Sequence, residues 1–433
     1  MKSEDQCILI AHGNDKNIYY FPESGVIERN LTTPVARPIL NPDIRNIENV
    51  PSSIKRLTIK LTGNCNMKCE YCFTNFHPSV GSIEQSVYQV AINSFVATLS
   101  KGDHVAIIIT GGEPLLYKHK VLDVLQLSMK LCSLKGCMCQ FLIYTNGTLI
   151  DNDLIEAFKE YDVSLAISID GPFDKHDNNR PMKSGTSSYA SIVSNLIKLY
   201  SNGIHVEART VIQPFESDII GLIQHNISLG FSQMHLLPVY GHKTNQIENV
   251  TAWTNALSYY VNMLKSGSRI EIVPFFHLFR KMMFPEYFIT SFFPCDAGKH
   301  KLCVSNDGNY YLCSHFAGAP YSSLSNVAET YPTDVQITTM LKQMQNPSCS
   351  CCWARRLCGG ACYHRTFLGK APNSSSDCDG WIEIIKLAIV LYCNELQDSP
   401  EVLQFFKDYR PMLSDEQKNA AYSYLQKTES GGK

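Results

Sequence analysis

The sequence predicts an α/β protein whose core is a partial (β/α)6 barrel, similar to a TIM barrel but with too few units to close eight-fold. Six short, β-branched apolar runs recur between Arg56 and Tyr240, and each of the first five precedes a stretch with helical periodicity. Strands that alternate with helices imply parallel pairing and right-handed crossovers. The unusual residues follow the ends of these runs, where such folds place their active sites.

The predicted barrel strands are residues 56–61, 105–110, 140–145, 163–169, 206–212 and 233–239. After the first strand, Ser82 is a predicted helix N-cap with Gln85 at the N3 position. The apolar face of that helix is predicted to comprise Ile83, Val87, Val90 and Ser94.

Four regions follow from this pattern. Residues 1–50 form a predicted β-hairpin extension, with strand-like runs at 7–11 and 17–21 and a third at 25–28. Residues 51–290 form the barrel, and residues 291–380 are cysteine-dense and loop-rich. Residues 381–433 show helical spacing, with a last helix predicted to start at Ser414.

Composition excludes several function classes. The chain has 433 residues and a net charge of −2, from 38 basic against 40 acidic side chains, which argues against nucleic-acid binding. No apolar stretch is long enough to cross a bilayer, and the first residues are too acidic and polar for a signal peptide. We therefore expect a cytoplasmic protein without membrane partners. In a reducing compartment, its seventeen cysteines favour metal or iron–sulfur ligation over disulfides.

The first cysteine constellation directly follows the first predicted barrel strand. Cys65, Cys69 and Cys72 are separated by three and two residues. Three thiolates on one tight loop can bind three irons of a cubane cluster and leave the fourth iron open to a ligand. The alternative is a zinc site that takes its fourth ligand from elsewhere, with His77 as the candidate.

Polar and glycine-rich motifs follow the next strands. The second strand ends in Gly111-Gly112-Glu113-Pro114, the third in Thr145-Asn146-Gly147 and the fourth in Ser168-Ile169-Asp170-Gly171. Glycines let a backbone approach a ligand closely, and Glu113 could bind an amino group. Ser168 and Asp170 suit hydroxyls or a carboxylate, and Arg209 on the fifth strand suits a carboxylate. The alternative for each motif is an ordinary turn, with an Asx bond at Asp170.

With these motifs, residues 52–240 resemble the radical S-adenosylmethionine (radical SAM) enzymes. The resemblance implies that SAM chelates the open iron and that the reduced cluster cleaves it to a 5′-deoxyadenosyl radical, which abstracts hydrogen from a substrate. It implies cluster ligation by Cys65, Cys69 and Cys72. It also implies SAM contacts by Tyr71, Gly111, Gly112, Glu113, Asn146, Ser168, Asp170, Arg209 and Leu237.

A second cysteine constellation lies in residues 291–380. Cys295 is followed by Gly308-x4-Cys313 and then by Cys349-x2-Cys352-x5-Cys358-x3-Cys362 and Cys378. Taken alone, this pattern could also form two zinc knuckles.

This pattern resembles the SPASM domain, the auxiliary-cluster extension of several peptide and sulfatase maturases. The resemblance implies two further [4Fe-4S] clusters, three in all. The distal one would be held by Cys349, Cys352, Cys358 and Cys378, and the one nearer the barrel by Cys295, Cys313 and Cys362. Cys303 is the candidate fourth ligand of the nearer cluster, and Cys351 is expected to be a bystander.

The resemblance implies a ribosomally made precursor peptide as substrate, an oxidative carbon–carbon, thioether or ether crosslink as product, and an external flavodoxin- or ferredoxin-type electron donor. The alternative enzyme is a sulfatase maturase that forms formylglycine. A non-catalytic iron–sulfur or zinc protein is the alternative of another class. Residues 1–50 are a candidate partial leader-binding element. Candidates for the acid or base that exchanges a proton with substrate are His176, Asp177, Arg180, Tyr240 and His315.

Overall fold

The fold was analysed in a computed structural model. It describes residues 4–5, 7–12, 17–22, 24–29, 37–38, 53–78, 81–239, 249–284, 294–369 and 378–408. Tyr240 and the helix predicted from Ser414 lie outside these residues. Among the described helices, none combines the length and the apolar character that a bilayer crossing requires.

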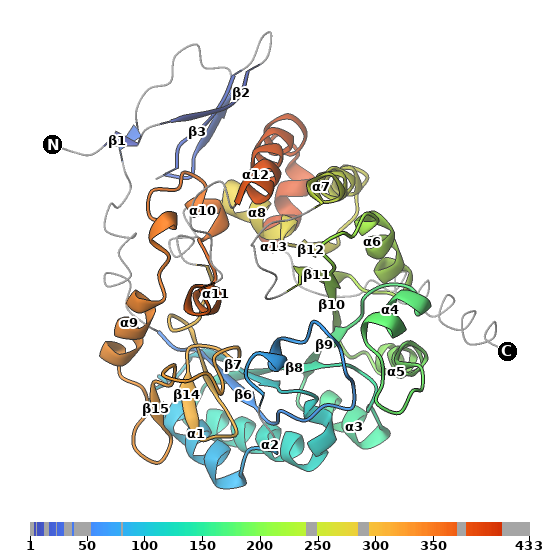
Figure 1. The fold of residues 1–433 in the computed structure, drawn as a ribbon, viewed down its shortest axis with the longest axis vertical. Helices are drawn as coiled ribbons and strands as arrows, with labels where there is room; N and C mark the ends of the chain where they lie inside the picture. The colour runs from blue at the N-terminus through green and yellow to red at the C-terminus, as the bar shows by residue number, and fades with distance from the viewer. Residues whose placement is uncertain are drawn as a thin grey trace.

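Six parallel strands form the centre of a curved, open sheet, which confirms the predicted partial barrel (Figure 1). They are β6 (Arg56–Lys60), β7 (His104–Thr110), β8 (Met138–Thr145), β9 (Val163–Ser168), β10 (Val206–Ile212) and β11 (Gln233–Pro238), paired in chain order. A short seventh parallel strand, β12 (Glu271–Val273), pairs with β11.

Helices cover the outer side of this sheet (Figure 1). They are α1 (Gln85–Ala97), α2 (Lys118–Lys135), α3 (Asn152–Glu160), α4 (Phe173–Asn179), α5 (Ser188–Ser201), α6 (Ile219–Ser228), α7 (Val250–Lys265) and α8 (Phe275–Met283). Strand alternation separates the two faces of the sheet. In β6, Leu57 and Ile59 belong to the apolar core, whereas Thr58 and Lys60 lie on the opposite face.

The start of α1 differs from the prediction. Glu84, not Ser82, is the N-cap residue, and it makes no side-chain cap hydrogen bond. Ser82 instead forms an isolated β-bridge with Thr62, at the beginning of the cysteine loop. The predicted apolar face is right only in part: Ile83 is fully buried and Val87 packs against the core, whereas Val90 is 42% exposed. The buried residues of α1 are Tyr88, Ala91, Ile92, Phe95 and Val96.

The cysteine-dense region is joined to the barrel by main-chain pairing. Strand β13 (Lys301–Val304) pairs in parallel with β6, and β14 (Asn309–Tyr311) and β15 (Ser325–Asn326) extend the same sheet in antiparallel fashion. The helices of this region are α9 (Asp334–Gln343), α10 (Arg355–Cys358) and α11 (Tyr363–Phe367). The sheet therefore runs without a break from the barrel into the predicted auxiliary-cluster region.

The N-terminal extension is a three-stranded antiparallel sheet of β2 (Ile8–His12), β3 (Asn17–Tyr20) and β4 (Ile27–Arg29). A separate pair joins β1 (Glu4–Asp5) and β5 (Arg37–Pro38). Strand β2 of this sheet packs against α12 (Asp379–Leu391), and α13 (Pro400–Asp408) packs against α8 (Figure 1). Tyr20 is fully buried and its ring lies 5.9 Å from that of Trp353, while Arg29 binds the carbonyl of Cys393.

Candidate active site

The cysteine loop lies at the carboxyl end of β6, where the sequence predicted it. Its three thiols lie close enough to influence one another electrostatically, and burial raises the pKa of Cys65 and of Cys69, the latter to about 11. Among the described residues, no three His, Cys, Asp or Glu side chains are arranged to hold a single metal ion. A cubane cluster binds each thiolate through a different iron, so its ligands need not meet at one point.

The two glycines at the end of β7 allow close contact with the chain that leads into Cys65. The amide of Gly112 donates to the carbonyl of Thr62 (2.7 Å) and the amide of Glu113 donates to that of Asn64 (2.8 Å). A Cβ atom on Gly112 would lie 2.3 Å from the Asn64 carbonyl oxygen, and one on Gly111 would lie 2.6 Å from that of Thr62. Only glycine fits these two positions without moving the loop.

Glu113 links β7 to the end of β8 from a fully buried position. Its Oε1 accepts hydrogen bonds from the Leu115 amide (3.0 Å) and the Thr145 hydroxyl (2.7 Å), and its Oε2 accepts one from the Asn146 amide (2.7 Å). Burial raises the pKa of Glu113 to about 7, although these donors act in the opposite direction. The predicted contact between Glu113 and the SAM amino group stays a prediction.

Asn146 connects Glu113 to the cysteine loop, because its amide binds Glu113 and its side chain binds Asn66. Its Nδ2 donates to Oδ1 of Asn66 (2.7 Å) and lies 3.9 Å from the sulfur of Cys65. Asn66 also donates to the hydroxyl of Thr148 (2.9 Å). The end of β8 therefore fixes the first half of the loop. Sequence analysis missed Asn66 because its partners lie about eighty residues further along the chain.

Ser168, Arg209 and His235 occupy neighbouring positions across three strands, since Ser168 pairs with Arg209 and Arg209 with His235. The Arg209 guanidinium lies 5.0 Å from the centroid of the Tyr144 ring and 3.6 Å from the Glu207 carboxylate. His235 lies 3.7 Å from the other Glu207 oxygen. Burial alone would raise the pKa of Glu207, but His235 and Arg209 lower it below its ordinary value. The predicted SAM contacts of Ser168 and Arg209 stay predictions.

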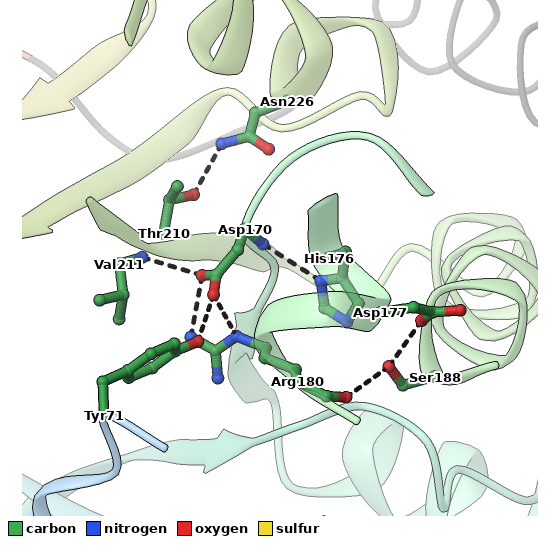
Figure 2. A network of polar contacts seen from close by, with 9 residues as sticks. All are labelled: Tyr71, Asp170, His176, Asp177, Arg180, Ser188, Thr210, Val211 and Asn226. Atoms are coloured by element: carbon green, nitrogen blue, oxygen red, sulfur yellow. Dashed lines mark hydrogen bonds and ion pairs between the residues drawn. The ribbon is translucent and has the colours of Figure 1, made fainter. Parts of the chain in front are cut away.

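Asp170 is bound on all sides by groups of the protein itself. Its carboxylate is fully buried and is bound by Arg180, by the Tyr71 hydroxyl and by the Val211 amide (Figure 2). Three hydrogen bonds and the ion pair leave this carboxylate no exposed surface. The carboxylate connects the cysteine loop to the ends of β9 and β10, and the predicted contact between Asp170 and SAM stays a prediction. The side chain of Tyr71 is likewise bound within the protein.

Five cysteines of the second constellation line one cavity of about 490 Å³. Its wall includes Cys349, Cys352, Cys358, Cys362 and Cys378. Cys351 is exposed and does not line the cavity, as expected for a bystander. Gly360 widens the space, because a Cβ there would lie 3.8 Å from the Cys349 sulfur. Soft thiolates around one cavity fit an iron–sulfur cluster, so the proposed distal site is consistent with the structure.

This cavity also reaches the barrel, because Leu236, Leu237 and Pro238 of β11 line it together with the cysteines. Leu237, predicted to lie beside SAM, thus lies where the barrel meets the auxiliary-cluster region. Apolar side chains of α12, among them Trp381 and Ile385, also line the cavity.

The three cysteines proposed to hold the nearer cluster are Cys295, Cys313 and Cys362, and their thiols lie close enough to interact electrostatically. The Cys362 thiol helps to raise the pKa of both Cys295 and Cys313, and Cys313 also acts on Cys295. Burial raises the pKa of Cys313 to about 12, and the adjacent Lys301 acts against this rise. Cys303 is fully buried on β13, and both Lys60 and Lys301 act on its thiol. Its assignment as fourth ligand stays a prediction.

Three histidines connect the two cysteine regions, a contact that sequence analysis missed. The Nε2 atoms of His77 and His364 are 3.2 Å apart, and the ring of His315 lies 4.2 Å from that of Phe73. His77 is thus engaged with His364. His315, one of the acid–base candidates, is partly buried in this aromatic cluster, and desolvation there lowers its pKa to about 3.

Three further acid–base candidates, His176, Asp177 and Arg180, belong to the buried network around Asp170 (Figure 2). No signal in the local sequence distinguishes such a network from a catalytic group, because its partners come from separate elements.

Residues 59–220 match the Radical SAM superfamily. Over 288 residues, the chain is 24% identical to the radical SAM cyclopropyl synthase TigE of Paramaledivibacter caminithermalis, which covers 61% of this chain and 58% of that protein. It is 25% identical over 164 residues to a serine-type anaerobic sulfatase-maturating enzyme of Bacteroides thetaiotaomicron, covering 36% and 38% of the two chains. The alignments thus span about half the length of these curated relatives.

Solved structures share the fold over a larger part of the chain. Native anSMEcpe with bound AdoMet superposes with a TM-score of 0.65 at 19% identity, covering 78% of this chain and 98% of that one. SuiB of Streptococcus suis bound to the precursor peptide SuiA gives 0.53 at 16% identity, covering 80% and 82%. Residues 59–220 therefore match the Radical SAM superfamily, and the chain shares its fold with anSMEcpe and SuiB.

Proposed function

We propose that this protein is a radical SAM enzyme that installs an oxidative crosslink in a ribosomally made precursor peptide. The observation that carries the proposal is the position of the two cysteine sets. One set forms a three-thiol loop at the carboxyl ends of the barrel strands, and the other lines a cavity that reaches β11. An open-iron site beside an auxiliary site is what substrate oxidation requires, whereas a pure electron carrier needs no open iron.

When bound, a [4Fe-4S] cluster and SAM would supply a 5′-deoxyadenosyl radical that removes a hydrogen atom from the peptide. In this proposal, Cys65, Cys69 and Cys72 bind the cluster, and Gly111, Gly112 and Asn146 support the loop. Ser168 and Arg209 contact SAM in this proposal, and Leu237 lines the cavity at the edge of the barrel. The auxiliary-cluster region encloses one side of this space and excludes water from the reacting atoms. An auxiliary cluster held by the second cysteine set would accept the second electron of the substrate as a proton is lost, and an external flavodoxin- or ferredoxin-type donor would reduce the first cluster.

A peptide substrate is supported by the relatives. TigE is a radical SAM cyclopropyl synthase, and SuiB was solved with the precursor peptide SuiA. We propose that the N-terminal sheet, β2 to β4, contributes to leader binding. Its packing on the C-terminal segments gives it a second role as a brace.

The cluster assignment is tested by anaerobic reconstitution of the full chain. Three cubanes predict roughly twelve irons per chain. Cys69→Ala is expected to abolish 5′-deoxyadenosine formation, whereas Cys351→Ala, which removes an exposed thiol outside the cavity, should leave it unchanged. Cys352→Ala should lose auxiliary iron and retain some uncoupled SAM cleavage. Zinc in place of iron, or full SAM cleavage by Cys69→Ala, would contradict the proposal.

Sulfatase maturation is the second candidate, because sulfatase-maturating enzymes are among the relatives. Loss of two hydrogens alone does not separate the two reactions, since oxidation of serine to formylglycine has the same mass change. The co-expressed peptide should therefore be treated with a carbonyl-reactive hydrazide and sequenced by tandem mass spectrometry. A crosslink gives no hydrazone and suppresses fragmentation between the joined residues. Hydrazone formation would favour the maturase.

A further inference from the structure

The segment that follows α4 pairs with the backbone of the cysteine loop. The Lys68 amide donates to the Pro181 carbonyl (3.0 Å), and the Lys183 amide donates to the Asn66 carbonyl (2.9 Å). Between them, Met67 and Met182 form an antiparallel β-bridge. Residues 181–183 therefore hold residues 66–68 in an extended conformation between the first two predicted cluster ligands.

A buried ion pair holds the second half of the loop. Arg180 binds both oxygens of Asp170, with Nη2 3.0 Å from Oδ1 and Nε 3.0 Å from Oδ2. The Tyr71 hydroxyl donates to the same carboxylate, and the guanidinium lies 5.3 Å from the centroid of the Tyr71 ring (Figure 2). Tyr71 stands between Cys69 and Cys72, so this network fixes the loop segment that carries two of the three thiols.

Further hydrogen bonds support the backbone of both members of the ion pair. The Asp170 amide donates to Nδ1 of His176 (3.1 Å). The Ser188 hydroxyl lies 2.8 Å from the Arg180 carbonyl and 2.9 Å from the Asp177 carboxylate (Figure 2). Arg180 is 7% exposed and Asp170 is fully buried. Because removing one partner would leave a buried charge uncompensated, the pair has to form whenever this region is folded.

We infer that Arg180 and Asp170 are positioning residues that, through Tyr71, hold the cysteine loop in its ligand-binding shape before any iron is bound. The inference rests on the proposed cluster site at Cys65, Cys69 and Cys72. The unfolded loop could adopt many conformations, and binding a cluster would otherwise have to order it. A loop that is ordered in advance exposes its three thiols in one arrangement and aligns the open iron with the strand ends.

Hydrogen exchange on the metal-free full chain tests this inference without iron. Peptides that cover residues 64–72 should be protected in the wild type. Tyr71→Phe removes one hydrogen bond to a charged group and should speed exchange there by roughly tenfold or more. Arg180→Met should remove the protection, and Arg180→Lys, which keeps the charge, should restore part of it. Tyr88→Phe is the matched control, because Tyr88 is also buried and also donates to a carboxylate, that of Asp123.

Iron release and the EPR signal of the reconstituted protein provide a second measurement, which a general loss of stability would not change. The cluster of Tyr71→Phe is expected to release iron to a chelator roughly tenfold faster than the wild type or Tyr88→Phe. The fraction of its reduced-cluster EPR signal that shifts on addition of SAM should fall. Unprotected residues 64–72 in the wild type, or unchanged exchange in both Tyr71→Phe and Arg180→Met, would overturn the inference.

These outcomes separate the inference from the proposed function. A wild-type protein with a protected loop but no SAM-responsive EPR signal would contradict the proposed function while supporting the ordered loop. A SAM-responsive cluster on an unprotected metal-free loop would support the proposed function and overturn the role of Arg180 and Asp170.

Discussion

Gly112 shows how a single absent side chain shapes the site. A Cβ atom at this position would lie 2.3 Å from the backbone oxygen of Asn64. Because that neighbour is a backbone atom, it cannot move aside as a flexible side chain can. Gly112→Ala should therefore displace the chain before Cys65, lower the free energy of unfolding by about 1–3 kcal/mol or more and impair iron loading of the first site. Denaturant unfolding of the metal-free protein and the SAM-dependent EPR signal after reconstitution would measure both effects.

Gly203→Ala is the control for backbone effects. Gly203 has a φ of +71°, and no heavy atom lies within 4 Å of the position of its Cβ. This variant should cost about 1 kcal/mol through its backbone conformation and leave the EPR signal unchanged. Equal loss of the SAM-responsive signal in both variants would mean that contact with Asn64 is not the reason for a glycine at position 112.

At the residue scale, sequence analysis located the cysteines and the glycines but not the partners of Asp170. The spacing of Cys349, Cys352 and Cys358 predicts a shared site, and the three side chains line one cavity. Asp170, in contrast, is bound by Tyr71 from 99 positions earlier and by Arg180 from ten positions later. A carboxylate at a strand end has the same local sequence whether it binds a ligand or a buried arginine.

The N-terminal sheet is an element whose packing carries a testable consequence. Tyr20 is fully buried against Trp353, which lies within the run of cysteines that lines the cavity. Tyr20→Ala should leave a cavity, destabilise this packing by about 3–5 kcal/mol and release the auxiliary iron, while the SAM-responsive signal persists. Iron analysis combined with EPR spectroscopy would show the selective loss.

Leu9→Ala on the same sheet is the comparison, since Leu9 is 50% exposed. It should retain the full iron content. If Tyr20→Ala also kept all its iron, the sheet would not brace the auxiliary region.

At the element scale, the six barrel strands were predicted closely because β-branched runs between helices give a clear periodic signal. The strands that join the auxiliary region to the barrel were missed. β13, β14 and β15 have four, three and two residues, too few to show a period. The start of α1 was misplaced because Ser82, a good N-cap by type, is engaged by the bridge to Thr62.

Across the whole molecule, buried histidines should make the metal-free protein sensitive to acid. Burial lowers the pKa of His176, His225 and His364 to about 4 each, from an ordinary value near 6.5. The unfolded chain therefore binds more protons between these values, and stability falls as the pH drops below about 6.5. The pKa of Glu113 is raised to about 7, so between pH 4.5 and 7 this carboxyl binds a proton more readily in the folded state and opposes the loss of stability. It is a single group, whereas three histidines act in the other direction.

We expect the melting temperature of the metal-free protein to fall steadily from pH 7 to pH 5. Thermal unfolding followed by circular dichroism would measure this slope. His225→Gln should flatten it, because the variant removes one of the three groups. A melting temperature that rises over this range would show that the histidines are protonated in the folded state.

The pairing of β13 with β6 bears on how this protein could be dissected. Truncation after residue 290 would remove β13, the strand that pairs with β6 on one side. The main-chain amides and carbonyls on that side of β6, the strand that leads into the cysteine loop, would then face solvent. Such a fragment would be prone to self-association through the bared edge. The barrel and the auxiliary region therefore behave as one cooperative folding unit, and swapping the auxiliary region between relatives would succeed only if β13 to β15 were exchanged together with a compatible β6.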